Sequence, residues 1–497
     1  MNPPLGPVKV STSRGTRVIA TATVVLLAWA TAIARGGQLL RDPDVFSHIA
    51  VGRWILAHGE VPTRDVFSHS MPGASWVAHE WLVEVAIALL YDRLGWAALA
   101  VAGATCFAAA LAILAYALLR YLPVPAMAAA VLLAWGLCFP HLVARPHIAV
   151  FPLLVIWTAS LVAARADNRA PSPWHALGLA LVMVLWANIH GSHVFGLGLA
   201  GMFAAEALFD APDRRAAWRA VRGWGAFVVV AVAAALATPH GISGLLFPFE
   251  VQRMSYALSW ITEWQQPDMQ RGHVLEVWLM LVLLGALSLG VRLPLTRIVM
   301  VLIILHMALV HQRHAELLGL CAPLIVAPAL AVELRRLADA PFVLSLRGLF
   351  NRPVLSAGLS RGTLATAVAI AVVVGAWRLP GLAVPDTYAP AAAVEAVKRA
   401  GITGRVFNDY DVGGYLIFAG IAPFIDGRLD MYGESLLRRF NALADLPRLL
   451  ADFDIGWTLF QPADPHVAEL DRLPGWRRFH ADDIAVVHVR TDAPQKR

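Results

Sequence analysis

The fold class is decided by an uncharged stretch in the first quarter of the chain, residues 97–119, which reads AALAVAGATCFAAALAILAYALL. About 20 apolar residues are enough for a helix to cross the hydrocarbon core of a bilayer. Ten further runs have the same character, so the sequence predicts about eleven membrane spans. Their ranges are 18–34, 97–119, 125–140, 148–164, 175–188, 194–209, 224–238, 274–290, 298–310, 315–332 and 363–378.

The composition of the whole chain agrees with these spans. Of 497 residues, 58% are hydrophobic and 15% are charged, whereas a soluble protein carries about 25% charged residues. This composition excludes a purely soluble enzyme. Cys106, Cys138 and Cys321 all fall inside predicted spans and are expected to be small buried hydrophobes. The spacing of these three cysteines predicts neither a disulfide framework nor a zinc site.

Charge divides the chain into two parts. Residues 1–380 contain 27 Lys and Arg against 18 Asp and Glu, and residues 381–497 contain 13 against 16. We therefore expect a polytopic α-helical membrane body over 1–380, with a long first outer loop at about 35–96. A soluble α/β domain is expected over 381–497. Because the positive excess lies in the membrane body, it does not indicate nucleic-acid binding.

The basic residues of the connecting loops predict an orientation, because cytoplasmic loops are enriched in Lys and Arg. Seventeen of the 27 lie on one side of the predicted spans. They are Lys9, Arg14, Arg17, Arg120, Arg165, Arg169, Arg214, Arg215, Arg219, Arg222, Arg292, Arg297, Arg335, Arg336, Arg347, Arg352 and Arg361. That side is expected to be cytoplasmic. The N-terminus is then cytoplasmic and the C-terminal domain periplasmic, as in a multi-pass protein of the bacterial inner membrane.

Two segments near the N-terminus have alternative interpretations. The first span, which ends in Ala32-Ile33-Ala34, fits either an uncleaved helix or a secretory signal. The uncleaved helix is favoured because a polytopic body follows directly. The segment 81–94 carries Glu84, Asp92 and Arg93 and is short for a span, so we expect an amphipathic helix on the membrane surface.

The histidines gather on the outer side. Twelve of the 17 fall in outer loops or at outer helix ends, whereas solvated loops would scatter them over both faces. They are His48, His58, His69, His79, His141, His147, His190, His193, His240, His273, His311 and His314. This distribution predicts a polar, chemically active outer cavity, to which His48, His79, Glu80, His190, His193 and Glu263 are candidate contributors.

Asp42 and Asp44 open the first outer loop just after the first span. An ionised carboxylate at such a partly desolvated position can act as a general base or as a ligand of a divalent metal ion. Both roles are kept open, and no cofactor is required by the spacing. The alternative is that both residues only cap the helix that begins near Val45.

Arg145 and His147, and likewise Arg313 and His314, each lie at an outer helix end. An arginine at that depth is well suited to a phosphate, which it can bind through two parallel charge-assisted hydrogen bonds. The alternative for either arginine is snorkelling to the membrane interface. Because histidines and carboxylates accompany both arginines, phosphate binding is favoured.

Two stretches stand out in the C-terminal part. Gly413-Gly414 permits close approach of the backbone to a ligand, although a tight turn is the favoured interpretation. Asp426 and Arg428 follow an apolar segment. They are expected either to contact the acceptor or the membrane body, or to form an ordinary surface ion pair.

Four short motifs resemble a known group. They are Asp42-Pro43-Asp44, His79-Glu80-Trp81, the helix end at 186–191, and Gly413-Gly414-Tyr415-Leu416. Together with the layout of the chain, they resemble the C-type-fold (GT-C) membrane glycosyltransferases that use polyprenyl-phosphate sugars, in a poorly characterised bacterial branch. The group includes protein O-mannosyltransferases, aminoarabinose transferases and oligosaccharyltransferase catalytic subunits. The resemblance implies that Asp42, or else Asp44, is the general base.

The expected function is inverting sugar transfer from a polyprenyl-phosphate donor to a glycan, lipid or protein acceptor of the cell envelope. One alternative is a transporter or flippase for a lipid-linked saccharide. The absence of an internal repeat and the scarcity of charges within the spans weigh against it. A non-catalytic envelope-assembly protein is the third possibility.

Overall fold

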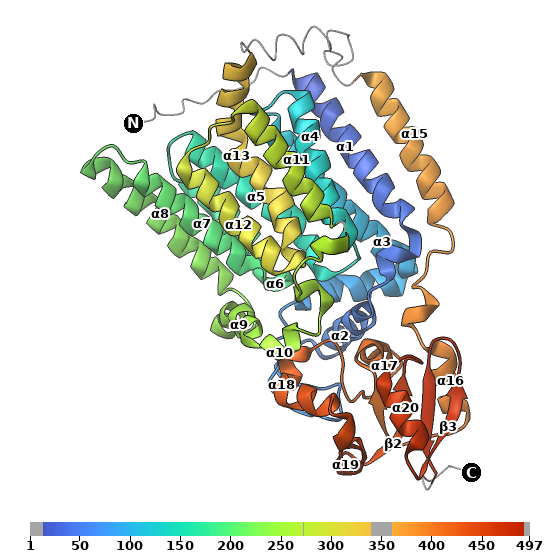
Figure 1. Cartoon of the computed structure of the whole chain (residues 1–497). Helices are drawn as coiled ribbons and strands as arrows, with labels where there is room; N and C mark the ends of the chain where they lie inside the picture. Colours follow the sequence, from blue (N-terminus) through green and yellow to red (C-terminus); the bar gives the residue numbers. More distant parts are fainter. Residues whose placement is uncertain (1–12, 272, 339–359, 492–497) are drawn as a thin grey trace.

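The computed structural model describes residues 13–271, 273–338 and 360–491. A bundle of long helices forms most of the molecule, and a small domain with a β-sheet lies beyond one end of it (Figure 1). The chain is thus a polytopic helical membrane protein with a C-terminal α/β domain, as predicted. Lys9, Arg347 and Arg352, which contribute to the predicted orientation, lie outside the described residues.

Each predicted span falls on a helix. Within the described ranges, seven helices are long and apolar enough to cross a membrane, and four shorter apolar helices accompany them. The long ones are α1 Arg14–Ala34, α3 Trp81–Leu118, α4 Val124–Cys138, α5 Pro146–Ala166, α8 Arg214–Ala235, α13 Ala315–Ala338 and α15 Arg361–Arg378. The short ones are α6 Pro173–Ile189, α7 His193–Phe209, α11 Val274–Leu289 and α12 Leu295–Val310.

Helix α3 contains the segment predicted to be a separate surface helix. Gly95 has a φ of 70° and a ψ of −165°, so a kink divides 81–94 from the long apolar remainder. A positive φ of this kind is accessible to glycine at little cost. Trp81–Leu94 is therefore a helical segment of its own, and its position on a membrane surface stays a prediction.

Three further helices lie at the end of the bundle that faces the small domain: α2 Asp44–His58, α9 Gly241–Arg253 and α10 Ser255–Leu258 (Figure 1). Helix α2 packs closely on the first segment of α3 because Gly52 has no side chain. A Cβ at this position would lie 2.1 Å from the carbonyl oxygen of Glu84. This close contact sets the residues of α2 directly against those that begin α3.

The C-terminal domain has a four-stranded sheet of order β1-β2-β4-β3. The strands are β1 Arg405–Asn408, β2 Ile455–Phe460, β3 Trp476–Ala481 and β4 Val486–Arg490, and only the β1–β2 pair is parallel. The helices are α16 Ala391–Arg399, α17 Gly413–Phe418, α18 Leu429–Phe440, α19 Leu446–Asp452 and α20 Pro465–Arg472. The sequence pattern of this domain predicts a strand near 422–425 and one long helix near 433–450. Both predictions are wrong: 422–425 form no strand, and α18 and α19 replace the long helix.

The domain is joined to the membrane body by a shared core. One buried apolar cluster contains Val51 and Ile55 of α2 together with Phe407 and Phe424 of the domain. Helix α17 of the domain packs closely on the start of α2 at Gly414. A Cβ at this position would lie 2.9 Å from the carbonyl oxygen of Pro43. The Gly-Gly pair therefore begins helix α17 and packs against protein backbone, so the favoured tight turn is wrong. Approach to a ligand stays a prediction.

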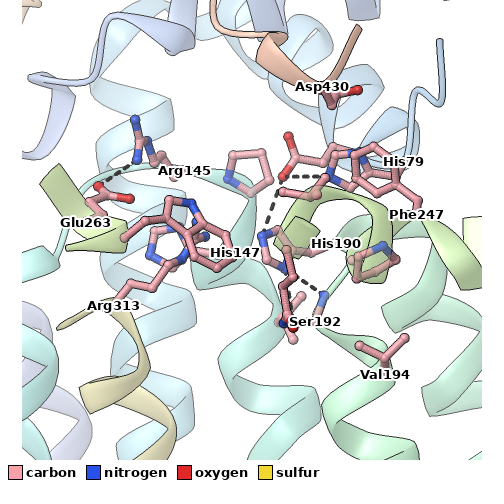
Figure 2. A pocket seen from close by; sticks show the side chains of 18 of the residues that line it. His79, Arg145, His147, His190, Ser192, Val194, Phe247, Glu263, Arg313 and Asp430 are labelled. Carbon is pink, nitrogen blue, oxygen red and sulfur yellow. Dashed lines mark hydrogen bonds and ion pairs between the residues drawn. The ribbon is translucent and has the colours of Figure 1, made fainter. Parts of the chain in front are cut away.

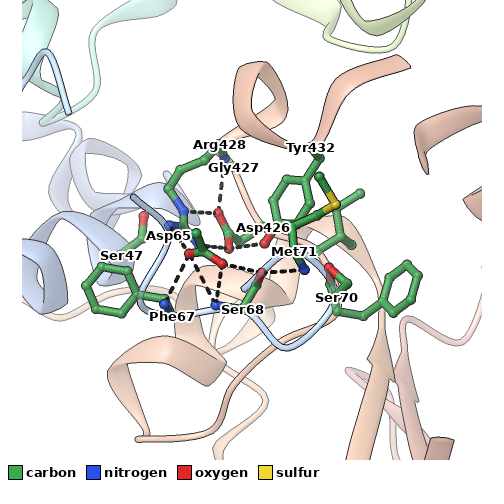
Figure 3. A network of polar contacts seen from close by, with 12 residues as sticks. Ser47, Asp65, Phe67, Ser68, Ser70, Met71, Asp426, Gly427, Arg428 and Tyr432 are labelled. Carbon is green, nitrogen blue, oxygen red and sulfur yellow. Dashed lines mark hydrogen bonds and ion pairs between the residues drawn. The ribbon is translucent and has the colours of Figure 1, made fainter. Parts of the chain in front are cut away.

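A buried polar network completes this junction (Figure 3). The Arg428 guanidinium donates to Asp426 Oδ1 and Oδ2 at 2.7 and 2.6 Å, and to Asp65 Oδ1 of the first outer loop at 2.7 Å. The hydroxyl of Tyr432 also donates to Asp426 Oδ2, at 2.6 Å. Because Asp426 is fully buried and Arg428 is 8% exposed, a surface ion pair is excluded and a contact with the membrane body is confirmed.

Candidate functional site

A cavity of about 590 Å³ lies where the predicted outer helix ends meet the C-terminal domain. It is lined by residues from α2, α5, α9 and α13 and from the start of α18. Figure 2 shows Arg145, His147, Arg313 and Glu263 on one side of it, with His79 and His190 on the other. Residues from five separate loops, all predicted to be outer ones, thus converge on one cavity.

Asp42 is held away from this cavity. Its carboxylate is paired with Arg145, which donates from Nε to Oδ2 and from Nη2 to Oδ1, the latter at 2.9 Å. Asp42 Oδ1 also accepts from the backbone N–H of Asp44 at 3.0 Å, at the start of α2. Asp42 is 4% exposed. It therefore caps the helix end and anchors Arg145, which leaves it poorly placed to receive a substrate proton.

Asp44 lines the cavity. Burial raises the pKa of this carboxyl group to about 6, although the nearby positive charge of His48 acts in the opposite direction. Gly427 packs directly against it, since a Cβ there would lie 2.2 Å from Asp44 Oδ1. A cavity-facing carboxylate with a pKa near neutrality is suited to accept a proton.

The guanidinium of Arg145 is occupied by carboxylates. Besides Asp42, it contacts Asp44 Oδ2 at 3.3 Å and Glu263 Oε1 at 2.6 Å. Burial alone would raise the pKa of Glu263, but the positive charges of Arg145 and Arg313 outweigh it and lower the pKa to about 2. Glu263 is therefore ionised, and three negative charges surround Arg145.

Arg313 lies in the short 3₁₀ turn Gln312–His314 and reaches the same cavity. Its guanidinium stacks over the ring of Trp264 at 4.7 Å. No carboxylate of the described residues forms an ion pair with it. An arginine with unfilled donors beside an apolar wall is the arrangement that binds a phosphate.

The neighbouring histidines are only weakly engaged. His147 Nε2 lies 3.7 Å from Glu316 Oε1. Burial and the charge of Arg313 lower the pKa of His314 to about 4, so this imidazole is neutral. Its Nδ1 lies 3.2 Å from the carbonyl oxygen of Met307. Both rings line the cavity, where His147 can donate to an anion.

His48, Glu80 and Glu84 form a second polar group in the cavity. His48 Nδ1 lies 3.0 Å from Glu84 Oε1 and 3.9 Å from Glu80 Oε2. Burial opposes protonation of His48, but the hydrogen bond to Glu84 and the negative charges around it raise its pKa to about 9. Burial raises the pKa of Glu80 to about 7.

This group is also the candidate metal site. Each of the three residues offers one ligand atom, and the three atoms lie within 4.8 Å of one another. Glu84 Oε2 is buried without a hydrogen-bond partner among the described residues. Nitrogen and carboxylate oxygen ligands suit zinc or manganese. Asp42 and Asp44, the metal ligands considered from the sequence, are instead paired with Arg145.

The remaining predicted histidines divide between cavity and core. His79 and His190 each place Nε2 3.7 Å from Glu80 Oε1 (Figure 2). Burial lowers the pKa of His79 to about 4 and that of His190 well below its usual range, so both are neutral donors. His193, in contrast, is 2% exposed at the start of α7 and does not line the cavity.

Several cavity residues were not among the sequence candidates: Glu84, Glu316, Tyr410 and Asp430. Asp430 reaches the cavity from the start of α18 (Figure 2), where burial raises its pKa to about 6. Glu84 was interpreted as a surface charge of an amphipathic helix. Glu84 lies four residues after Glu80, a spacing that places two side chains on the same face of a helix. This spacing could have predicted that Glu84 lies in the same site as Glu80.

One wall of the cavity is apolar. Leu154 of α5, Met202 of α7, Ile303 and Met307 of α12, and Leu317 of α13 line it. These residues lie on helices that are predicted spans, so the cavity extends from its polar end along the apolar helices. The arrangement can hold an amphiphile, with its polar head near Arg313 and its chain between the helices.

The fold is shared with two crystal structures of ArnT from Cupriavidus metallidurans. The structure bound to undecaprenyl phosphate is 12% identical in sequence, with a TM-score of 0.52, and the match covers 96% of this chain and 98% of ArnT. The apo structure is 13% identical, with a TM-score of 0.53, and the match covers 95% and 97%. No protein-family model matches the chain, and no curated protein matches it in sequence.

Proposed function

We propose that this ArnT-like chain is a GT-C glycosyltransferase that moves a sugar from a polyprenyl-phosphate donor to an envelope glycan, lipid or protein. The observation that carries the proposal is one cavity with a carboxylate of raised pKa, Asp44, and an arginine, Arg313, that forms no ion pair with a carboxylate of the described residues. Its apolar wall suits a polyprenyl chain. The undecaprenyl phosphate bound to ArnT supports a donor of this class.

The reaction follows from these groups. The donor phosphate binds Arg313, with His147 as a further donor, and the polyprenyl chain lies along the apolar wall. An acceptor hydroxyl attacks the anomeric carbon from the face opposite the phosphate and gives its proton to the Asp44 carboxylate. The bond between the anomeric carbon and the phosphate oxygen breaks, and polyprenyl phosphate leaves with its charge stabilised by Arg313. The configuration at the anomeric carbon is inverted.

Two features of the site belong to the same proposal. We place any divalent cation that the reaction uses on His48, Glu80 and Glu84, where the ligand atoms converge. We also place the cavity on the extracytoplasmic side of the inner membrane. Arg120, Arg165 and Arg169 lie at the other ends of α3 and α5, and basic loops mark the cytoplasmic side.

The direct test is sugar transfer by the purified full chain in nanodiscs. We expect release of polyprenyl phosphate and formation of an inverted glycoside when a labelled polyprenyl-phosphate sugar is supplied with an acceptor. Movement of the intact donor across a proteoliposome membrane, without cleavage, would favour a flippase. Binding of envelope glycan by the chain with neither transfer nor transport would favour an assembly role.

Removing the Arg313 side chain should weaken binding of polyprenyl phosphate. A hydrogen bond to a charged group contributes about 1.5–3 kcal/mol, so Arg313→Ala should raise the Kd for undecaprenyl phosphate about 10- to 100-fold. Arg253→Ala is the matched control, because Arg253 is exposed on α9 at the same end of the molecule. Titration of the detergent-solubilised variants measures both values. Equal Kd values for Arg313→Ala and the control would contradict the assignment.

The rate of transfer should fall as the pH is lowered through about 6. The active form of Asp44 is the carboxylate, and its raised pKa means that protonation removes this form below about pH 6. Arg145, His48, Glu263, Asp411 and Asp426 are the charged groups that act on it. We expect this acidic limb, the decrease below about pH 6, in a plot of kcat/KM against pH, and we expect the Glu80→Gln variant to keep it. Loss of the acidic limb in Glu80→Gln would assign the titration to Glu80 instead of Asp44.

A further inference from the structure

A second cavity, of about 580 Å³, lies at the opposite end of the helix bundle. Arg17 in α1, Arg120 just after α3, Asp167 just after α5 and His175 near the start of α6 all line it. The cavity of the proposed reaction lies at the other ends of α5 and α6. The second cavity therefore takes no part in that site.

The polar lining of this second cavity is predominantly positive. Arg120 and Arg169 share the one carboxylate among the described lining residues, Asp167, and Arg17 and His175 also line the cavity. The contacts are long: Arg120 Nη2 lies 3.4 Å from Asp167 Oδ1, and Arg169 Nη2 lies 3.3 Å from Asp167 Oδ2. One carboxylate thus bridges two guanidinium groups and leaves an excess of positive charge.

A buried hydroxyl group completes the polar lining. Tyr121 is 5% exposed and lines the same cavity. Its Oη is buried and has no hydrogen-bond partner among the described residues. A buried polar group without a partner costs free energy unless a ligand or water satisfies it. This hydroxyl is therefore a second, independent indication of a bound polar ligand.

The other walls are apolar. Ile113 of α3, Ile156 of α5, Leu179 of α6 and Leu324 of α13 contribute to them. An inorganic anion would gain nothing from this surface, whereas an acyl chain would bury apolar area against it. The combination of a basic end and an apolar groove between membrane helices matches a lipid with an anionic phosphate head.

We propose that this cavity binds an anionic phospholipid. Its phosphate binds those N–H donors of Arg120 and Arg169 that do not contact Asp167, with the Tyr121 hydroxyl as a further donor. Its acyl chains lie against the apolar walls. Basic pockets between helices at a cytoplasmic membrane surface bind lipid head groups in this way. The proposal is independent of sugar transfer, because no residue of the proposed reaction lines this cavity.

The test compares lipid binding by the full chain and two matched variants, by native mass spectrometry and by titration in detergent. The Arg120→Ala/Arg169→Ala variant should bind phosphatidylglycerol about 30-fold more weakly, from about 1 kcal/mol for each arginine near the surface. Arg214→Ala/Arg215→Ala should bind it as the unmodified chain does. These arginines are exposed at the start of α8, at the same end of the bundle, and do not line the cavity.

Further binding measurements distinguish an anionic lipid from a zwitterionic lipid and from inorganic phosphate. Phosphatidylcholine should bind more weakly than phosphatidylglycerol, and inorganic phosphate should not displace either. Full displacement of phosphatidylglycerol by inorganic phosphate would overturn the lipid assignment in favour of a free-phosphate site. Equal binding of both lipids that is insensitive to the arginine variants would overturn the site altogether. Tyr121→Phe, which keeps the ring, should weaken phosphatidylglycerol binding several-fold if the hydroxyl contacts the phosphate.

Discussion

Replacing Asp44 by Asn should lower sugar transfer at least about 100-fold, while undecaprenyl phosphate still binds. A positioned general base contributes about 10²- to 10⁴-fold to a rate, and the Asn amide keeps the shape of the side chain but cannot accept the proton. Among the described residues, Arg313 forms no ion pair with Asp44, whose carboxylate is paired with Arg145. The defect should therefore appear in kcat more than in the Kd of the lipid product.

Gly427→Ala tests the same group without changing its chemistry. The new Cβ would lie 2.2 Å from Asp44 Oδ1, so the carboxylate must move. We expect reduced transfer by a protein that is still folded, because the overlap is with a side chain at the cavity wall. Gly225→Ala is the matched control, because Gly225 does not line the cavity and has open space around the new Cβ. Full activity of both Asp44→Asn and Gly427→Ala would contradict the role of Asp44.

Asp42→Asn discriminates between the two carboxylates. Asp42 holds Arg145 and caps α2, so its loss should disturb the position of Asp44 without removing the proton acceptor. We expect a smaller loss of transfer than in Asp44→Asn and a pH limb that still lies near 6. A greater loss in Asp42→Asn, with Asp44→Asn close to the unmodified enzyme, would exchange the two roles.

Replacing Arg428 by Ala should destabilise the protein by about 3–5 kcal/mol, because breaking a buried ion pair from one side leaves uncompensated charge. Here two buried carboxylates, Asp65 and Asp426, would lose their common partner. The guanidinium also packs 4.8 Å from the ring centre of Trp76. Since Asp65 belongs to the first outer loop and Asp426 to the C-terminal domain, the junction between the two should open.

Reversible unfolding in mixed micelles measures the loss of stability, and limited proteolysis measures opening of the junction. Arg438→Ala is the matched control: its side chain is 60% exposed and pairs with Glu434 at 3.6 Å. An exposed pair of this kind contributes about 0–1 kcal/mol. If Arg428→Ala unfolds at the same denaturant concentration as Arg438→Ala, the network does not hold the domain in place.

Much of the architecture follows from local sequence. A hydrophobic run predicts a membrane helix from its own length and composition, and all eleven predicted ranges coincide with helices. Counting spans also assigns each loop to one of two ends. That count alone predicted that Arg145, His190 and Arg313 lie at the same end of the bundle, and all three line one cavity there.

The short elements of the C-terminal domain were less predictable. Residues 422–425 are apolar enough for a strand, yet they make a loop against Asn408, whose side chain accepts from the backbone N–H of Phe424 at 2.7 Å. The expected long helix over 433–450 ends at Phe440, where the chain turns before α19. Both differences arise from contacts with distant residues, which a local pattern does not contain.

The sequence by itself determined that this protein spans a membrane, where its helices lie and which polar groups share an end, because hydrophobic length and the alternation of loops are local properties. Tertiary structure alone decided which carboxylate lines the cavity. Asp44 does, whereas Asp42 is buried against Arg145, 103 residues away, and Arg428 is buried against Asp65, 363 residues away. The charge that a group presents to a substrate depends on such partners, and only the folded chain brings them within hydrogen-bond distance.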